Sequence, residues 1–254
     1  MLFKLFKSQS FYALLLICFF VPVLQGAEVV SRLTGAVIAN EVTKPPSEKI
    51  KQDVNLNAKS SLRLQFEPII ASVSEQLLTQ HEQYKKDPKA YQAFLDQHVR
   101  PYWDSSSTAR ALIGSAEFKP LSKKTKHDFV QAVDKTLVRY AFEGIAFYSG
   151  QQFQLVDVAL SDSGKMGWVQ VLIRSKVLPD LNLDILVKRN KMGKWQAVDV
   201  SFEGITYVAV KKYQFKKILE KQGVGALTAS LNEKNNQFFG EPCATNDKVD
   251  KQTC

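Results

Sequence analysis

Strand-like segments separated by short turn signals fill the middle of the chain and constrain its fold most. Residues 181–188 alternate apolar and polar side chains, the two-residue period of a strand buried on one face. Residues 153–160 and 167–177 are also strand-like, and the turn-forming residues 162–164 and 179–180 separate the three segments. Connections this short join antiparallel neighbours, because parallel strands need a crossover of a dozen or more residues. The pattern therefore predicts an antiparallel meander.

A fourth strand-like segment begins at Trp195 and leads into a basic helical segment. Glu203-Gly204 interrupts this strand, and we expect a bend there before the strand continues from Ile205 to Val210. From Lys211 the period becomes helical, which predicts a helix whose ammonium groups stay in water. Strict alternation predicts one strand face made of Gln196, Val198, Val200 and Phe202, and an opposite face made of Trp195, Ala197, Asp199 and Ser201.

Helical patterns flank the strands on both sides. Apolar residues at spacings of three and four predict a helix from Leu62 and another from Pro88, with Asp87 as its N-cap. A short helix follows from 105 to 113, and Ser122 begins the longest one. Helices, then strands, then helices predict an α+β fold with one curved antiparallel sheet packed on a helical layer.

The chain ends predict export and two peripheral segments. Residues 1–27 combine a basic start, an apolar run shorter than the ~20 residues of a membrane span, and small residues near Ala27, so we predict a signal peptide. Residues 28–60 are polar and predict a flexible arm, residues 61–238 the domain itself, and residues 239–254 a polar tail.

Two cysteines of the tail and the overall charge leave alternatives open. Cys243 and Cys254 are consistent with a disulfide in an oxidising compartment or with two free thiols, and no metal-ligand spacing accompanies them. The formal charge of +9 at pH 7 becomes +7 without residues 1–27, which hold two lysines and no acidic residue. A basic exported protein fits anionic headgroups or acidic protein surfaces rather than nucleic acid, and a solvated face without a partner is the alternative.

Catalytic patterns are weak. His81, His98 and His127 are expected on helix surfaces, and the sequence has no nucleophile elbow, zinc-protease motif or phosphate loop. Asp199 and Glu203 are four residues apart and could form a pair of carboxylates in a hydrolase, or could hydrogen-bond the backbone at a bend of the sheet. We predict the structural role, no catalytic residue and no metal.

Two sets of motifs carry a resemblance. One lies in the fourth strand and last helices: Trp195, Asp199-Val200, Glu203-Gly204-Ile205-Thr206, Phe215, Gly223, Leu227 and Leu231. The other lies in the helical half: Asp87-Pro88, Tyr91, Val99, Pro101-Tyr102, Ile113-Gly114, Phe118-Lys119 and Tyr148-Ser149-Gly150-Gln151. In this order and spacing the chain resembles the toluene-tolerance (MlaC-type) periplasmic phospholipid carriers.

The resemblance implies a cone-like fold, similar to the nuclear-transport-factor type, with a lipid cavity between sheet and helices. The pattern alone also fits an ordinary filled core, because periodicity does not distinguish a packed core from a cavity. The residues expected to contact lipid are Phe129, Val133, Leu137 and Tyr140 on the longest helix and Val169, Val171, Ile173, Leu183, Ile185, Val198 and Val200 on strands.

The resemblance also implies a function and partners. It predicts a monomeric shuttle that is not an enzyme, needs no cofactor beyond its phospholipid ligand, and helps to maintain outer-membrane lipid asymmetry. Its implied partners are an outer-membrane lipoprotein–porin complex and an inner-membrane ABC transporter with a ring-shaped lipid-binding subunit. Lys211, Lys212, Lys216 and Lys217 are expected to contact the headgroup or acidic partner surfaces. The alternatives are a periplasmic hydrolase that uses Asp199 or Glu203, and a structural adaptor with a filled core.

Overall fold

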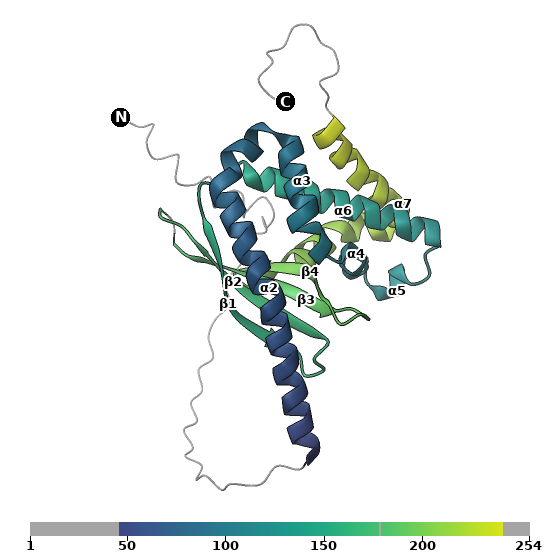
Figure 1. Ribbon diagram of the computed structural model, residues 1–254. Helices are drawn as coiled ribbons and strands as arrows, with labels where there is room; N and C mark the ends of the chain where they lie inside the picture. Colours follow the sequence, from purple (N-terminus) through teal and green to yellow (C-terminus); the bar gives the residue numbers. More distant parts are fainter. Residues whose placement is uncertain (1–45, 178, 241–254) are drawn as a thin grey trace, which may run out of the picture.

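The computed structural model describes residues 46–177 and 179–240, with side chains from residue 56 onward (Figure 1). The predicted signal peptide, most of the predicted arm, Cys243 and Cys254 lie outside these residues. Helices α2, α3, α4, α5 and α6, with the short 3-10 helix η1, precede the strands, and helix α7 follows them. The order of helices, strands and helices predicted from the sequence is confirmed.

The five strands form one antiparallel sheet in the order β1-β2-β3-β4-β5. They comprise β1 (Gln152–Leu160), β2 (Met166–Arg174), β3 (Leu181–Arg189), β4 (Trp195–Phe202) and β5 (Ile205–Thr206). Each strand pairs with its neighbour in the chain, so the predicted meander is confirmed, and the sheet is open with β1 and β5 at its edges. β2 ends at Arg174, three residues earlier than the apolar pattern predicts.

A β-bulge at Val198 changes which residues of β4 share a face. Val187 pairs with Ala197, whereas Ile185, two residues earlier on β3, pairs with Val200. Val198 is therefore the extra residue, and the two-residue period is broken there. The strict alternation predicted from the sequence is wrong for this strand. One face carries Trp195, Ala197, Val200 and Phe202 together, opposite Arg189, Val187, Ile185 and Leu183.

The segment after β4 is a tight hairpin and then a helix. Glu203 and Gly204 both have positive φ, 48° and 81°, as a two-residue hairpin turn requires, and Ser201 pairs with Thr206 across it. The predicted strand from Ile205 to Val210 is wrong, because α7 begins at Tyr207. The Asp199 carboxylate and the Thr206 hydroxyl accept hydrogen bonds from backbone N–H groups of the first turn of α7 and so satisfy its free donors.

Polar side chains cap the N-termini of several helices. Their bounds are α2 (Pro46–Lys86), α3 (Pro88–His98), η1 (Arg100–Tyr102), α4 (Ser105–Ile113), α5 (Ser115–Phe118), α6 (Lys123–Ile145) and α7 (Tyr207–Gly240). The predicted N-cap Asp87 is confirmed, Ser122 caps α6, and Asp104 caps α4. The helix predicted from Leu62 begins earlier, at Pro46, and α7 breaks at Gly223, whose φ is 76°.

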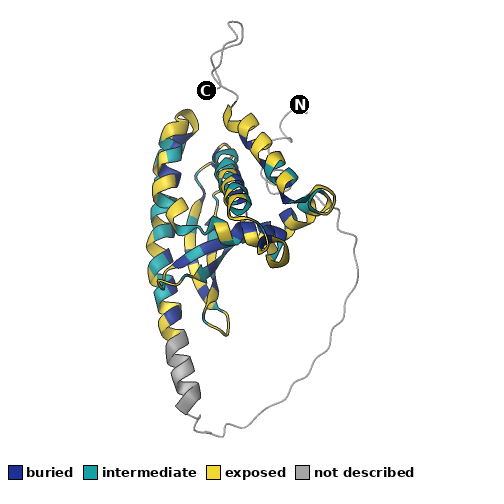
Figure 2. Ribbon diagram, turned by 90° about the vertical axis from the view of Figure 1, so that its right-hand side faces the viewer, coloured by how far each residue is buried: buried dark blue, intermediate teal, exposed yellow. Residues whose placement is uncertain are grey.

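Three groups of buried residues hold these layers together. α2 lies across the sheet (Figures 1 and 2). Its residues Leu62 and Phe66 pack on the strands. Gln65 fixes its position, because its side-chain amide bonds both the backbone N and O of Trp195, at 3.0 and 2.7 Å. A second group joins α4, α6 and α7, and a third, rich in aromatic residues, joins α2, α3 and the end of α6. Packing between helices therefore contributes to the core of the described residues, as does packing of α2 on the sheet.

Candidate functional site

An apolar cavity of about 550 Å³ lies between one end of the sheet and the helices α2, α3 and α6. Its volume is within the ~300–1,000 Å³ that ligand pockets commonly occupy. Ile173, Leu183, Val200 and Phe202 supply its sheet side. Its helical side is made mainly of Val73, Leu77, Tyr91, Phe94, Leu95, Leu137, Val138, Tyr140, Ala141 and Phe147, and the start of α7 adds Tyr207 and Val210. The wall is almost entirely carbon.

Five of the residues expected to contact lipid line this cavity. They are Leu137, Tyr140, Ile173, Leu183 and Val200. The structure brings them together from α6, β2, β3 and β4, although 63 positions separate Leu137 from Val200 in the sequence.

The other six expected residues are packed elsewhere. Phe129 and Val133 lie between α4, α6 and α7, since only the C-terminal half of α6 faces the sheet. Val169, Val171 and Ile185 lie under α2, which covers the neighbouring part of the same sheet face. Val198 is the bulge residue, and its carbonyl accepts a hydrogen bond of 2.7 Å from the buried Thr108 hydroxyl.

Several aromatic residues of the wall are absent from the residues expected to contact lipid, among them Tyr91, Phe94, Tyr148 and Phe153. Tyr91 and Phe94 of α3 stack with each other, and Phe153 of β1 stacks on Tyr148. The apolar spacing in α3 signals a buried face, but only the fold shows that this face meets α6. The Tyr91 hydroxyl donates to the carbonyl of Ala141 at 3.0 Å, and burial raises its pKa, so the polar tip is satisfied and the ring faces the cavity.

Charged groups at the cavity wall are paired with each other. Arg100 lies 2.6 Å from both Asp96 and Asp134, and Arg139 bridges to Glu143 at 2.5 Å. The hydrogen bond from Arg100 holds the pKa of Asp96 below its usual range. Arg100, Asp134 and Glu143 line the cavity, and each of them is held in an ion pair.

Lys211 differs from the other three predicted lysines. Only 8% of it is exposed, and its Nζ lies 5.1 Å from the ring centroid of Tyr140 and 6.0 Å from that of Tyr207. It donates to Gln214 at 3.1 Å, but no carboxylate of the described residues lies within salt-bridge distance. The expectation that all four ammonium groups stay in water is wrong for Lys211, whereas Lys212, Lys216 and Lys217 are exposed. Lys211 therefore places a positive charge directly behind two aromatic residues of the cavity wall.

Asp199 and Glu203 are both occupied by backbone hydrogen bonds. Asp199 accepts from the N–H groups of Val200 and Val208 at 2.8 and 3.1 Å, and burial raises its pKa. Glu203 accepts from the N–H of Asn182 at 2.7 Å. Neither lines the apolar cavity. These contacts stabilise the hairpin and the start of α7, as the structural alternative expects.

The remaining candidates for chemistry are scattered. His81 bonds the carbonyl of Leu77, His98 stacks on Phe94, and His127 is exposed, so the three histidines lie in different environments. Within residues 46–177 and 179–240, no three histidine, cysteine or acidic side chains are grouped so that they could hold a metal ion. The helices of the same residues include none with the length and apolarity of a membrane span.

The fold and the cavity define a class of protein, an α+β protein in which an open antiparallel sheet and a helical layer enclose an apolar chamber. The family model described as MlaC protein matches residues 68–233. This chain therefore belongs to the MlaC family, as the motifs of its sequence indicate.

A solved structure has the same fold. The phospholipid-binding protein of Ralstonia solanacearum, determined in complex with a phospholipid, superposes with a TM-score of 0.51. The match covers 76% of this chain and 97% of that protein, at 19% sequence identity. At this identity the likeness shows the fold, and the ligand is a property of the Ralstonia protein.

Proposed function

We propose that this protein holds a phospholipid in the apolar cavity and carries it through the periplasm. The observation that carries the proposal is an apolar chamber of about 550 Å³ in a member of the MlaC family. A carrier is needed because each methylene kept from water contributes about 0.8 kcal/mol, so two acyl chains of roughly thirty methylenes do not cross an aqueous space unaided. The phospholipid in the Ralstonia protein of the same fold supports this choice of ligand.

In the proposed complex the acyl chains contact the cavity wall and the phosphate lies near Lys211. Leu137, Tyr140, Leu183 and other wall residues offer carbon surface to the chains. Lys211 is nearly buried without a carboxylate partner among the described residues, which is costly for a charge unless an anion neutralises it. A lipid phosphate near Tyr140 would supply that negative charge.

The route is part of the proposal. The predicted signal peptide of residues 1–27 directs the chain to the periplasm. There it exchanges phospholipid between an outer-membrane lipoprotein–porin complex and an inner-membrane ABC transporter with a ring-shaped lipid-binding subunit, and this exchange maintains outer-membrane asymmetry. We propose a monomer that binds without catalysis, with Lys212, Lys216 and Lys217 available to acidic surfaces of the partners.

Native mass spectrometry of the protein purified from the periplasm tests the proposal. We expect a bound mass of one diacyl phospholipid per chain, identified by lipid extraction. A chain that carries no lipid and takes none from vesicles would contradict the proposal and would favour the structural adaptor. Transfer of fluorescent phospholipid between two vesicle populations then separates a carrier, which speeds transfer, from a protein that only stores lipid.

A further inference from the structure

A second hollow lies on the helical layer, between α4, α5 and the first turns of α6, and has a volume of about 470 Å³. It shares none of its lining residues with the apolar cavity, although α6 contributes to both. Lys126 and Val130 line this hollow, whereas Asp134, Leu137 and later residues of α6 line the cavity. A ligand in the hollow would therefore leave the cavity open.

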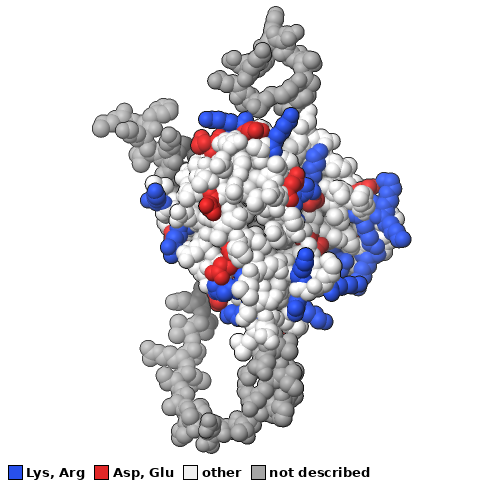
Figure 3. All heavy atoms as spheres, viewed as in Figure 1, with Lys and Arg blue, Asp and Glu red and all other residues white. Residues whose placement is uncertain are grey.

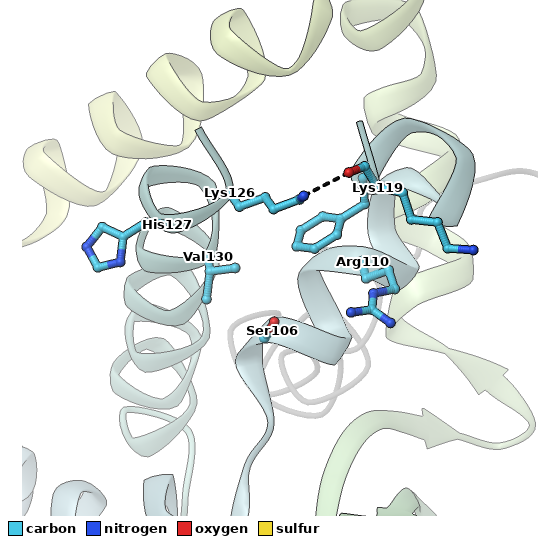
Figure 4. A pocket seen from close by; sticks show the side chains of 7 residues that line it. Ser106, Arg110, Lys119, Lys126, His127 and Val130 are labelled. Carbon is cyan, nitrogen blue, oxygen red and sulfur yellow. Dashed lines mark hydrogen bonds between the residues drawn. The ribbon is translucent and has the colours of Figure 1, made fainter. Parts of the chain in front are cut away.

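The hollow is built around the ring of Phe118. This side chain is 4% exposed, and the Arg110 guanidinium carbon and the Lys126 Nζ lie 5.4 and 5.9 Å from its ring centroid. Figure 4 shows Arg110 on α4 and Lys126 extending from α6 to Lys119, to whose carbonyl it donates a hydrogen bond of 2.8 Å. Cation–π contacts and this hydrogen bond hold the two cations in place before any ligand arrives.

The charge of this hollow is not balanced by nearby acids. Within the described part of the chain, Arg110, Lys119 and Lys126 have no carboxylate oxygen within 4.0 Å, whereas the adjacent Lys124 pairs with Asp128 at 2.6 Å. Lys and Arg side chains, blue in Figure 3, gather on the side of the molecule where Figure 1 places α5 and the start of α6. Fixed cations without partners attract anions over the Debye length, about 8 Å at physiological salt.

We propose that this hollow is a docking site for an acidic segment of a partner protein. Carboxylates of such a segment would bond Arg110 and Lys126, and an apolar group between them would lie near Phe118. A membrane surface fits less well, because none of the exposed large apolar side chains of the described residues lies on α4, α5 or the first half of α6. Binding to a bilayer interface usually combines basic residues with such apolar side chains. Docking at this hollow does not depend on what the apolar cavity holds.

The test uses a fluorescein-labelled hexaglutamate peptide and the purified protein at low ionic strength. The pocket variant is Arg110→Gln with Lys126→Gln, and the matched control is Lys165→Gln with Lys176→Gln, which removes the same charge from exposed positions before and after β2. Fluorescence anisotropy is expected to show binding that weakens at least about tenfold in the pocket variant and less than about twofold in the control. Equal losses in the two variants, or a wild-type protein that does not bind, would overturn the proposal.

Two further measurements separate the remaining outcomes. Sedimentation with vesicles of phosphatidylethanolamine and phosphatidylglycerol should be the same for the pocket variant and the control. If only vesicle binding depends on Arg110 and Lys126, the site recognises a membrane and the proposal is wrong. Native mass spectrometry of the same variants should show an unchanged lipid content, so a failure of the carrier function and a failure of acidic docking give different results.

Discussion

Gly144 offers a substitution that should weaken phospholipid binding while strengthening the fold. It lies in the last turn of α6 and lines the cavity, and a Cβ built on it meets no atom within 4 Å. Its φ is not positive, so a larger side chain fits the backbone. We therefore expect Gly144→Leu to place its side chain in the cavity without disturbing the wall.

The two effects have opposite signs. Glycine is a poorer helix former than leucine by up to about 0.8 kcal/mol, and we expect a gain of about 0.5 kcal/mol in the free energy of unfolding, since the position is near a helix end. The leucine side chain displaces about four methylene equivalents of acyl chain, each contributing about 0.8 kcal/mol. The proposed phospholipid should therefore bind about 3 kcal/mol more weakly, roughly 150-fold in Kd.

Urea unfolding of lipid-free protein and displacement of a fluorescent phospholipid measure the two effects. Gly225→Leu is the matched control, because Gly225 is exposed on α7, also has open space around its Cβ position, and lies outside the cavity. Unchanged phospholipid binding by a folded Gly144→Leu protein would refute the cavity as the lipid site. A loss of more than about 1 kcal/mol of stability would refute the reasoning about free space.

Three further substitutions test the fold. Gly167→Ala brings a Cβ to 2.6 Å from the backbone oxygen of Ala159, and should lower the free energy of unfolding by about 1–3 kcal/mol in urea titrations. Burial raises the pKa of Asp199 above its unfolded value, so its carboxyl favours folding below the unfolded pKa and loses that contribution as pH rises through the folded pKa. The Asp199→Asn protein should therefore be as stable and hold as much lipid at pH 7 as the wild type, and its stability should depend less on pH between these two pKa values. If the substitution instead abolished a phospholipid turnover, that result would favour the hydrolase. Asn235 is fully buried and bonded to Thr136, so Asn235→Ala should cost about 1–3 kcal/mol, and a smaller change in thermal unfolding would contradict its anchoring role.

The sheet order could be predicted from the sequence because its determinants are local. A two-residue period and short turn signals are enough to specify an antiparallel meander, and the confirmed N-cap Asp87 acts within its own helix. The faces of β4 could not be predicted, because the bulge at Val198 depends on how β3 pairs with it. Glu203-Gly204 is visible in the sequence as an interruption of the strand. The positive φ values of these residues and the cap from Asp199, which produce a hairpin followed by a helix, are seen only in the fold.

The cavity wall was predictable only in part for a related reason. Phe129, Val133, Leu137 and Tyr140 belong to one apolar stripe of α6, in which they recur at spacings of three or four residues. The stripe meets α4 and α7 at its first half and the cavity at its second. Periodicity specifies that a face is buried but not which element covers it, so the pattern could not separate Val133 from Leu137.

The bulge at Val198 also limits how this protein can change during evolution. β4 packs Trp195 and Ala197 beneath α2 and presents Val200 and Phe202 to the cavity, and the extra residue between the pairs keeps all four on one face. Removing or adding one residue there would move either Trp195 and Ala197 or Val200 and Phe202 to the opposite face of the sheet, because neighbouring strand positions point to opposite faces. Changes in chain length should therefore accumulate in the hairpin turns of relatives, while the residue count between Trp195 and Phe202 stays constant.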